Sequence, residues 1–203
     1  MVSREVTRKG AETIANIIRT GAEILLEEGF TALTKRKIAS RLNISHGNVG
    51  YYFPTRESLW RAVVEYELKE YYKVHHSKFC IDSDDPQANF NEYVTSWINE
   101  YDDRVVRVFF SHIIAFGEVN KDIAKLRDEI YEIFFEQTLR LAQALEPGVE
   151  PSELERRVLA VIVLLEGLHV VSAFRPEIVE RDEVFKQFIL AQANAIIHGH
   201  NSG

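Results

Sequence analysis

The sequence predicts an all-α protein of about nine helices, and three observations support this fold class. Apolar residues recur at helical spacing along most of the chain, as in the series from Ile14 to Leu26. Residues that commonly begin or end helices flank these apolar series. No alternating run and no hairpin dipeptide indicates a β-strand. The chain has 203 residues, 46% of them hydrophobic, which is enough to bury a substantial core.

Four helices are expected in the first 78 residues, over approximately 14–29, 35–42, 46–53 and 56–78. Their boundaries carry a glycine suited to a left-handed cap, hydroxyl side chains that can accept backbone N–H groups, and a proline that cannot continue a helix. These boundary residues are Gly29, Thr34, Ser45, Pro54 and Thr55. The second and third helices are short, and the tight turn between them gives the pattern of a helix-turn-helix.

Five further helices are expected after a break at 81–85. They would cover about 86–101, 104–117, 120–146, 152–174 and 182–198. Asp85 followed by Pro86 is typical of a helix start. Ser152 and Glu155 have the spacing of a capping box, so we expect the eighth helix to begin there. Pro176 is expected to follow its end.

The charge is divided unevenly along the chain. Residues 1–61 carry ten Lys/Arg and six Asp/Glu, a net charge of +4, whereas the remainder carries 14 and 25, a net charge of −11. A basic first third on an acidic body is consistent with a nucleic-acid-binding head. A solvated helical surface would show the same balance.

The composition also narrows the location of the protein. The single cysteine, Cys80, excludes an intramolecular disulfide, and the first 13 residues lack the apolar core of a signal peptide. The most apolar segment, Val158–Phe174, is shorter than a membrane span of ~20 residues and contains Glu166 and His169. We therefore expect a buried helix, no membrane partner and a soluble cytoplasmic protein.

No pattern in the sequence indicates an enzyme, a metal or a cofactor. The nucleophile-elbow, zinc-protease, phosphate-loop and paired-cysteine motifs are missing from the sequence. The histidines at 75–76 and at 198 and 200 lack matched ligands and are expected at the surface. The segment Gly47–Gly50 matches the GxxG of RNA-binding KH domains, but that fold needs strands.

The third expected helix has a distinctive surface. Val49 and Phe53 are four residues apart and can pack inward together. The polar and aromatic residues left for the surface are His46, Gly47, Asn48, Tyr51 and Tyr52. Such groups can bind phosphates and base edges, so DNA is a natural partner. Tyr52 can alternatively belong partly to the core.

Residues 17–59 resemble the DNA-binding head of the tetracycline-repressor (TetR) family of bacterial regulators. The resemblance lies in the ungapped pattern Ala22…Leu26…Glu28-Gly29-Phe30…Leu33-Thr34…Ile38-Ala39…Leu42-Asn43-Ile44-Ser45…Gly47…Val49…Tyr52-Phe53-Pro54-Thr55-Arg56-Glu57-Ser58-Leu59. One departure is Gly50, because many family members have a tyrosine there. A usual DNA contact is therefore in doubt, and the glycine weakens the helix by ~1 kcal/mol of propensity.

The resemblance implies a domain plan and a set of DNA contacts. A helix-turn-helix domain would occupy residues 10–56, a linking helix about 55–78, and an effector-binding and dimerisation domain 79–200. The implied DNA-binding residues are Thr34, Lys35, Arg36, Ser45, His46, Gly47, Asn48, Tyr51, Tyr52 and Arg56. Among them, Asn48 and His46 could read bases, Lys35 and Arg36 would touch phosphate or base edges, and Arg56 would bind phosphate. Lys37 and Arg41 are expected to be solvated.

The resemblance further implies a homodimer that binds a palindromic operator and is released by a small-molecule effector, as a repressor. The last two apolar helices support a dimer, although burial within one subunit is the alternative. The implied interface residues are Leu159, Ile162, Val163, Val170, Phe185, Phe188, Ile189 and Gln192.

Aromatic and polar residues of the expected body could line the effector pocket. These candidates are Tyr93, Trp97, Phe109, His112, Phe116, Tyr131, Phe134, Glu166 and His169. The aromatic residues could equally form core, and Glu166 with His169 could be a satisfied core pair or an interfacial one. Two other functions remain open, namely a helical protein-interaction module and a regulator that needs no ligand.

Overall fold

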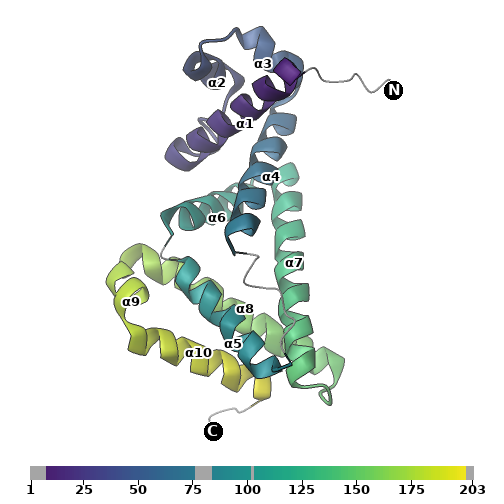
Figure 1. Cartoon of the computed structure of the whole chain (residues 1–203), viewed down its shortest axis with the longest axis vertical. Helices are drawn as coiled ribbons and strands as arrows, with labels where there is room; N and C mark the ends of the chain where they lie inside the picture. Colours follow the sequence, from purple (N-terminus) through teal and green to yellow (C-terminus); the bar gives the residue numbers. More distant parts are fainter. Residues whose placement is uncertain (1–7, 76–83, 102, 200–203) are drawn as a thin grey trace. The chain divides into compact units, whose positions relative to one another are not determined.

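The computed structural model describes residues 8–75, 84–101 and 103–199, which form ten α-helices and no strand (Figure 1). The helices are α1 (Arg8–Glu28), α2 (Lys35–Leu42), α3 (His46–Tyr52), α4 (Arg56–His75), α5 (Pro86–Glu100), α6 (Arg104–Gly117), α7 (Lys121–Leu145), α8 (Pro151–Phe174), α9 (Pro176–Arg181) and α10 (Glu183–His198). The predicted all-α fold class is confirmed.

The chain divides into two compact units. The first comprises Met1–Tyr72 and Val108–Arg127, and the second comprises Lys73–Arg107 and Asp128–Gly203. Helices α6 and α7 therefore contribute to both units. The expected effector domain, 79–200, thus supplies part of the first unit.

Helices α1 and α4 approach each other closely at one point of the first unit. A Cβ atom on Gly21 would lie 2.6 Å from the Val63 side chain, so α1 approaches α4 at a position where only glycine fits. The indole nitrogen of Trp60 donates a hydrogen bond to the Leu33 carbonyl oxygen at 3.1 Å. That bond ties α4 to the segment between α1 and α2, just before the helix-turn-helix.

An aromatic cluster joins α6 to the rest of the first unit. The Phe116 ring stacks on Phe30 at 4.8 Å and meets Trp60 edge-on at 4.9 Å. His112 lies beside the C-terminal cap of α1, where Gly29 has a positive φ of 80°. A Cβ on Gly29 would lie 3.0 Å from the His112 ring, so both the backbone conformation and the close approach require glycine there.

In the second unit, α5, α8 and α10 pack against one another, and they lie side by side in Figure 1. A polar network fastens one end of this packing. His198 on α10 bonds to Glu146 at 2.5 Å and to Gln87 on α5 at 3.0 Å. The Gln87 amide also donates to Asn194 at 2.5 Å. These hydrogen bonds thereby connect helices that are distant in the sequence.

Helix α1 begins at Arg8, earlier than the expected start near residue 14. Two features later in the chain also differ from the expected helices. Ser152 does not cap α8, because Glu150 is the N-cap residue and accepts the backbone N–H of Glu153 at 3.1 Å, with Pro151 in the first turn. Pro176 follows the end of α8 as expected, but it also begins the six-residue α9, which is not among the nine expected helices. In both cases proline occupies the first helical turn, where its missing N–H costs no hydrogen bond. The expected end of the fourth helix, near residue 78, lies outside the described residues.

Candidate functional site

Side-chain caps build the helix-turn-helix. The Thr34 hydroxyl accepts the Lys37 backbone N–H at 3.2 Å and begins α2. The Ser45 hydroxyl accepts the Asn48 backbone N–H at 3.1 Å and begins α3. Between them Asn43 adopts the left-handed conformation, with φ of 51°, which turns the chain from one helix to the next.

Helix α3 buries one side and exposes the other. Val49 is fully buried and Phe53 nearly so, which anchors the helix as predicted. Tyr51 is 65% exposed, and its ring meets Tyr52 edge-on at 5.1 Å. The other predicted DNA contacts that are exposed are Arg36, Ser45, His46, Gly47, Asn48 and Arg56, whereas Thr34, Lys35 and Tyr52 are half-buried. The exposed side of α3 is therefore a polar and aromatic surface that is accessible to solvent.

Basic side chains near this face are held in two different ways. The Lys35 ammonium donates to the Pro54 carbonyl oxygen, and the Arg56 guanidinium lies 4.3 Å from the centre of the Trp60 ring. Lys37 and Arg41 instead form ion pairs with acidic residues at the end of α1, Glu27 and Glu28. Two positive charges are thus neutralised within the head.

The glycine at position 47 is not required by the packing of the first unit. A Cβ atom there would meet only the Ser45 hydroxyl oxygen, at an ordinary distance of 3.9 Å. Its backbone φ is not positive. The small side chain leaves the exposed side of α3 free for close approach from outside.

The structure separates the effector candidates into three groups. Tyr93, Trp97 and Phe134 form packed core in the second unit: the Tyr93 hydroxyl lies 2.8 Å from the Thr138 hydroxyl, and Trp97 meets Phe134 edge-on at 5.1 Å. In the first unit, Phe109 packs on Phe110, while His112 and Phe116 join the cluster around Phe30. The remaining three, Tyr131, Glu166 and His169, share one region of the second unit.

That region is a polar cluster between helices. Burial raises the pKa of Glu166 to about 6, and a hydrogen bond with Tyr131 partly opposes this rise. Burial and then the nearby Glu166 charge raise the pKa of Tyr101 well above its ordinary value. His169 meets the Tyr101 ring edge-on at 5.6 Å, and burial followed by the Arg107 charge lowers the pKa of His169.

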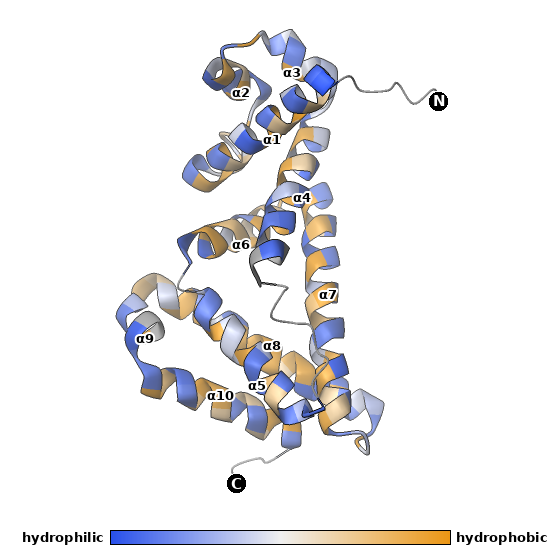
Figure 2. Ribbon diagram, in the orientation of Figure 1, coloured by the Kyte–Doolittle hydropathy of each residue, from blue (hydrophilic) through white to orange (hydrophobic). Residues whose placement is uncertain are grey.

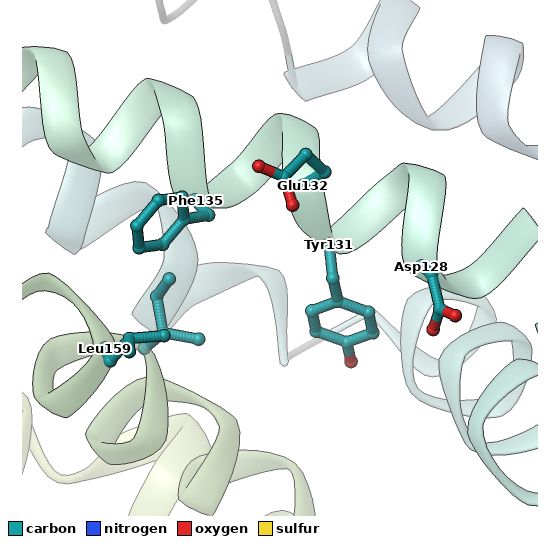
Figure 3. Close-up of a pocket in the computed structure, with 6 residues that line it drawn as sticks. Asp128, Tyr131, Glu132, Phe135 and Leu159 are labelled. Carbon is teal, nitrogen blue, oxygen red and sulfur yellow. The ribbon is translucent and has the colours of Figure 1, made fainter. Parts of the chain in front are cut away.

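A pocket of about 410 Å³ adjoins this cluster between α7 and α8. Its lining residues are Asp128, Tyr131, Glu132, Phe135, Leu159 and Ile162. In Figure 3, Tyr131 and Asp128 point to the same side of α7, Phe135 faces Leu159, and Glu132 turns away from Leu159. Sequence reasoning missed Asp128 and Glu132 as pocket residues, although their spacing with Tyr131 and Phe135 places all four on neighbouring positions of one helix face.

Helices α8 and α10 expose apolar side chains. On α8, Leu159, Val163 and Val170 are 53%, 71% and 64% exposed, and Figure 2 shows how hydrophobic this helix is. On α10 Phe188 is also exposed, whereas Ile189 is only 6% exposed and packs within its own unit. The other predicted interface residues, Ile162, Phe185 and Gln192, are half-buried. Phe174 and Val184 are exposed apolar residues that sequence reasoning missed.

Within one copy of the chain, this apolar segment is buried on one side only. Among the described residues, α8 is the one helix that is long and apolar enough to cross a membrane, judged by length and composition only. Of its most apolar 18-residue segment, 28% is buried within the chain. Its buried side is formed by Leu154, Val158, Val161, Leu165, Leu168 and Ser172. The exposed apolar side chains lie on a different side of the helix, so α8 has one buried and one exposed apolar side.

Comparisons with known proteins agree with this architecture. Residues 17–63 match the family model described as bacterial regulatory proteins, tetR family. No curated protein matches the sequence. A putative transcriptional regulator from Pseudomonas aeruginosa PAO1 is similar in structure, with a TM-score of 0.76 and 14% identity over 98% of this chain and 96% of that one.

Two further solved structures share the fold. A TetR transcription regulator from Haloarcula marismortui has a TM-score of 0.71 and 15% identity, over 93% of this chain and 98% of that one. A putative transcriptional regulator from Saccharomonospora viridis, in complex with choline, has a TM-score of 0.65 and 14% identity, over 93% of this chain and 96% of that one. The fold thus extends across nearly the whole chain.

Proposed function

We propose that this chain is a transcriptional regulator of the TetR family, whose model its residues 17–63 match, that it binds a palindromic operator as a homodimer, and that a small-molecule effector releases it. It would act as a repressor in the cytoplasm, with no catalytic activity, cofactor or membrane partner. The observation that carries the proposal is the exposed polar face of a capped α3 within the matched segment.

The DNA-binding part of the proposal rests on the residues of that face. Asn48 can form two hydrogen bonds with adenine, and His46 can donate to guanine. Arg36 and Arg56 are exposed and can bind phosphates on either side. Gly47 permits close approach between them. Lys37 and Arg41 contribute less, because acidic partners already neutralise them.

The dimer is supported by the exposed apolar surface of α8 and α10. The stripe on α8 formed by Leu159, Val163, Val170 and Phe174 is too apolar to be left in water, and Phe188 adds to it on α10. A second copy of the chain would cover the same surface on both subunits in a two-fold arrangement. Such symmetry would match two operator half-sites about one helical turn apart.

Effector binding is supported by the pocket between α7 and α8. The similar Saccharomonospora viridis regulator was solved in complex with choline, so a protein of this fold can hold a small molecule. A ligand in such a pocket can release DNA only if it binds one conformation of the dimer better than another.

The decisive experiment measures the binding of a fluorescent duplex, taken from the region upstream of the protein's own gene, as salt is raised. Specific binding should weaken steeply with salt because phosphate contacts release counterions. Asn48→Ala should reduce the preference for this duplex over a scrambled one, by ~1–3 kcal/mol. Arg56→Ala should instead weaken binding to both duplexes.

A matched control is Arg156→Ala, which removes one positive charge from an exposed position on α8 in the second unit. It should leave DNA affinity unchanged. Affinity that does not depend on salt, or equal effects of Asn48→Ala and Arg156→Ala, would contradict the proposed operator contacts and favour a protein-interaction module.

A further inference from the structure

The pocket between α7 and α8 combines aromatic rings with negative charge. Tyr131 and Phe135 supply the rings, and Asp128 and Glu132 supply carboxylates one turn apart along the same helix. On the α8 side, Leu159 and Ile162 complete the lining, and none of the six lining residues is basic. The lining therefore carries two negative charges beside an apolar surface.

A third carboxyl group lies next to this pocket. Glu166 follows Ile162 by four residues on α8, which places it on the same side of the helix one turn further on. It hydrogen-bonds with Tyr131, a residue of the pocket itself. Arg107 is a basic group on the His169 side of this cluster, where it donates to the Tyr101 carbonyl oxygen and adds to the effect of burial in lowering the pKa of His169.

These features select among classes of ligand. An anion would be repelled by Asp128, Glu132 and Glu166. A neutral apolar molecule would contact the rings and Leu159 but would gain nothing from the charges. A cation with an apolar body gains from both, because an ammonium group is attracted to aromatic faces and to carboxylates.

We propose that this pocket binds an organic cation that carries an apolar group, with Tyr131 and Phe135 contacting the ligand and Asp128 and Glu166 supplying the opposing charge. The inference deepens the proposed function, and the pocket's role as the effector site rests on that function. The binding itself is independent of DNA. Glu132 lies at the rim and contributes less, because its side chain turns away from Leu159 (Figure 3).

The test is calorimetric titration of the full chain, without DNA, with three probes that share a benzene ring. Benzyltrimethylammonium is cationic, benzyl alcohol is neutral and benzenesulfonate is anionic. We expect the cation to bind about tenfold more tightly than the alcohol, and the sulfonate least tightly.

Three variants locate the site. Asp128→Asn and Glu166→Gln keep the size of each side chain and should each weaken the cation several-fold, with no effect on benzyl alcohol. The matched control is Glu136→Gln, which removes a negative charge from an exposed position of α7 outside the pocket. It should bind the cation as the wild type does.

Equal affinity for the three probes would overturn the inference, as would no detectable cation binding at millimolar concentration or equal effects of Asp128→Asn and Glu136→Gln. A separate measurement adds benzyltrimethylammonium to the operator complex. If the cation binds the chain but operator affinity does not change, the proposed effector control fails while the site stands. If the chain shows no specific DNA binding, the proposed function fails independently.

Discussion

Replacing Gly47 with alanine separates the stability of the head from its affinity for DNA. The added Cβ would lie 3.9 Å from the Ser45 hydroxyl oxygen and touch nothing else in its own subunit. Alanine has a higher helix propensity than glycine by up to about 1 kcal/mol. Gly47→Ala should therefore leave the free energy of unfolding unchanged or raise it by up to that amount.

DNA affinity should change in the opposite direction. Gly47 and Tyr51 are four residues apart, so the new methyl group would project from the middle of the exposed face of α3. Interference of about 1 kcal/mol at each half-site would total about 2 kcal/mol for a dimer, which is roughly 30-fold in affinity. Fluorescence anisotropy with the operator duplex measures affinity, and thermal unfolding followed by circular dichroism measures stability.

Gly50→Ala provides the matched control. A Cβ at this position would have nothing within 4 Å, but Gly50 is half-buried and lies nearer the anchored side of α3. It should gain the same stability with a smaller loss of affinity. If Gly47→Ala is folded and binds the operator as tightly as the wild type, then the exposed face of α3 does not approach DNA closely and the reasoning is refuted.

Three further outcomes are expected. Thr138→Val removes the buried partner of the Tyr93 hydroxyl and should cost about 1–2 kcal/mol in chemical unfolding, and adding Tyr93→Phe should recover most of it; an additive loss would contradict the pairing. Because the folded pKa of Glu166 is raised to about 6 from an ordinary 4.5, stability from this group should fall as pH rises from about 4.5 to 6. Glu166→Gln should remove this pH dependence and raise stability at pH 8 by about 2 kcal/mol; an unchanged profile would contradict the raised pKa. Val163→Glu should convert the proposed dimer to a monomer in light scattering, whereas Ile133→Glu, at an exposed apolar position of α7, should not; a dimer that survives Val163→Glu would place the interface elsewhere.

The boundaries that join the first three helices were predictable because they depend on local chemistry. Thr34, Ser45 and Gly29 act on backbone atoms within a few residues of themselves, and all three behave as their residue types predict. The start of α8 was missed because two acceptors compete there. Glu150 stands before Pro151, and that arrangement prevails over the capping box pattern at Ser152.

The candidate pocket was only partly predictable, because it depends on which helices pack together. Tyr131 was recognised as a candidate from its aromatic character, but Asp128 resembled any solvated acid on a helix surface. His112 and Phe116 had the same aromatic signature and instead pack against Phe30, which no local pattern foretells. Whether an aromatic residue becomes part of the core or lines a pocket depends on which distant helices pack against it.

Leu159 belongs both to the wall of the pocket and to the exposed apolar stripe of α8. A partner that covers this stripe would therefore also narrow the opening through which a small molecule enters the pocket. In a dimer, the partner subunit would slow the entry of a ligand into the pocket, and a bulky ligand that extends beyond Leu159 would contact both subunits. The rate of ligand exchange would then depend on protein concentration, because dilution separates the subunits. Measuring this rate in a dilution series would show that the pocket borders the dimer interface, without any mutation.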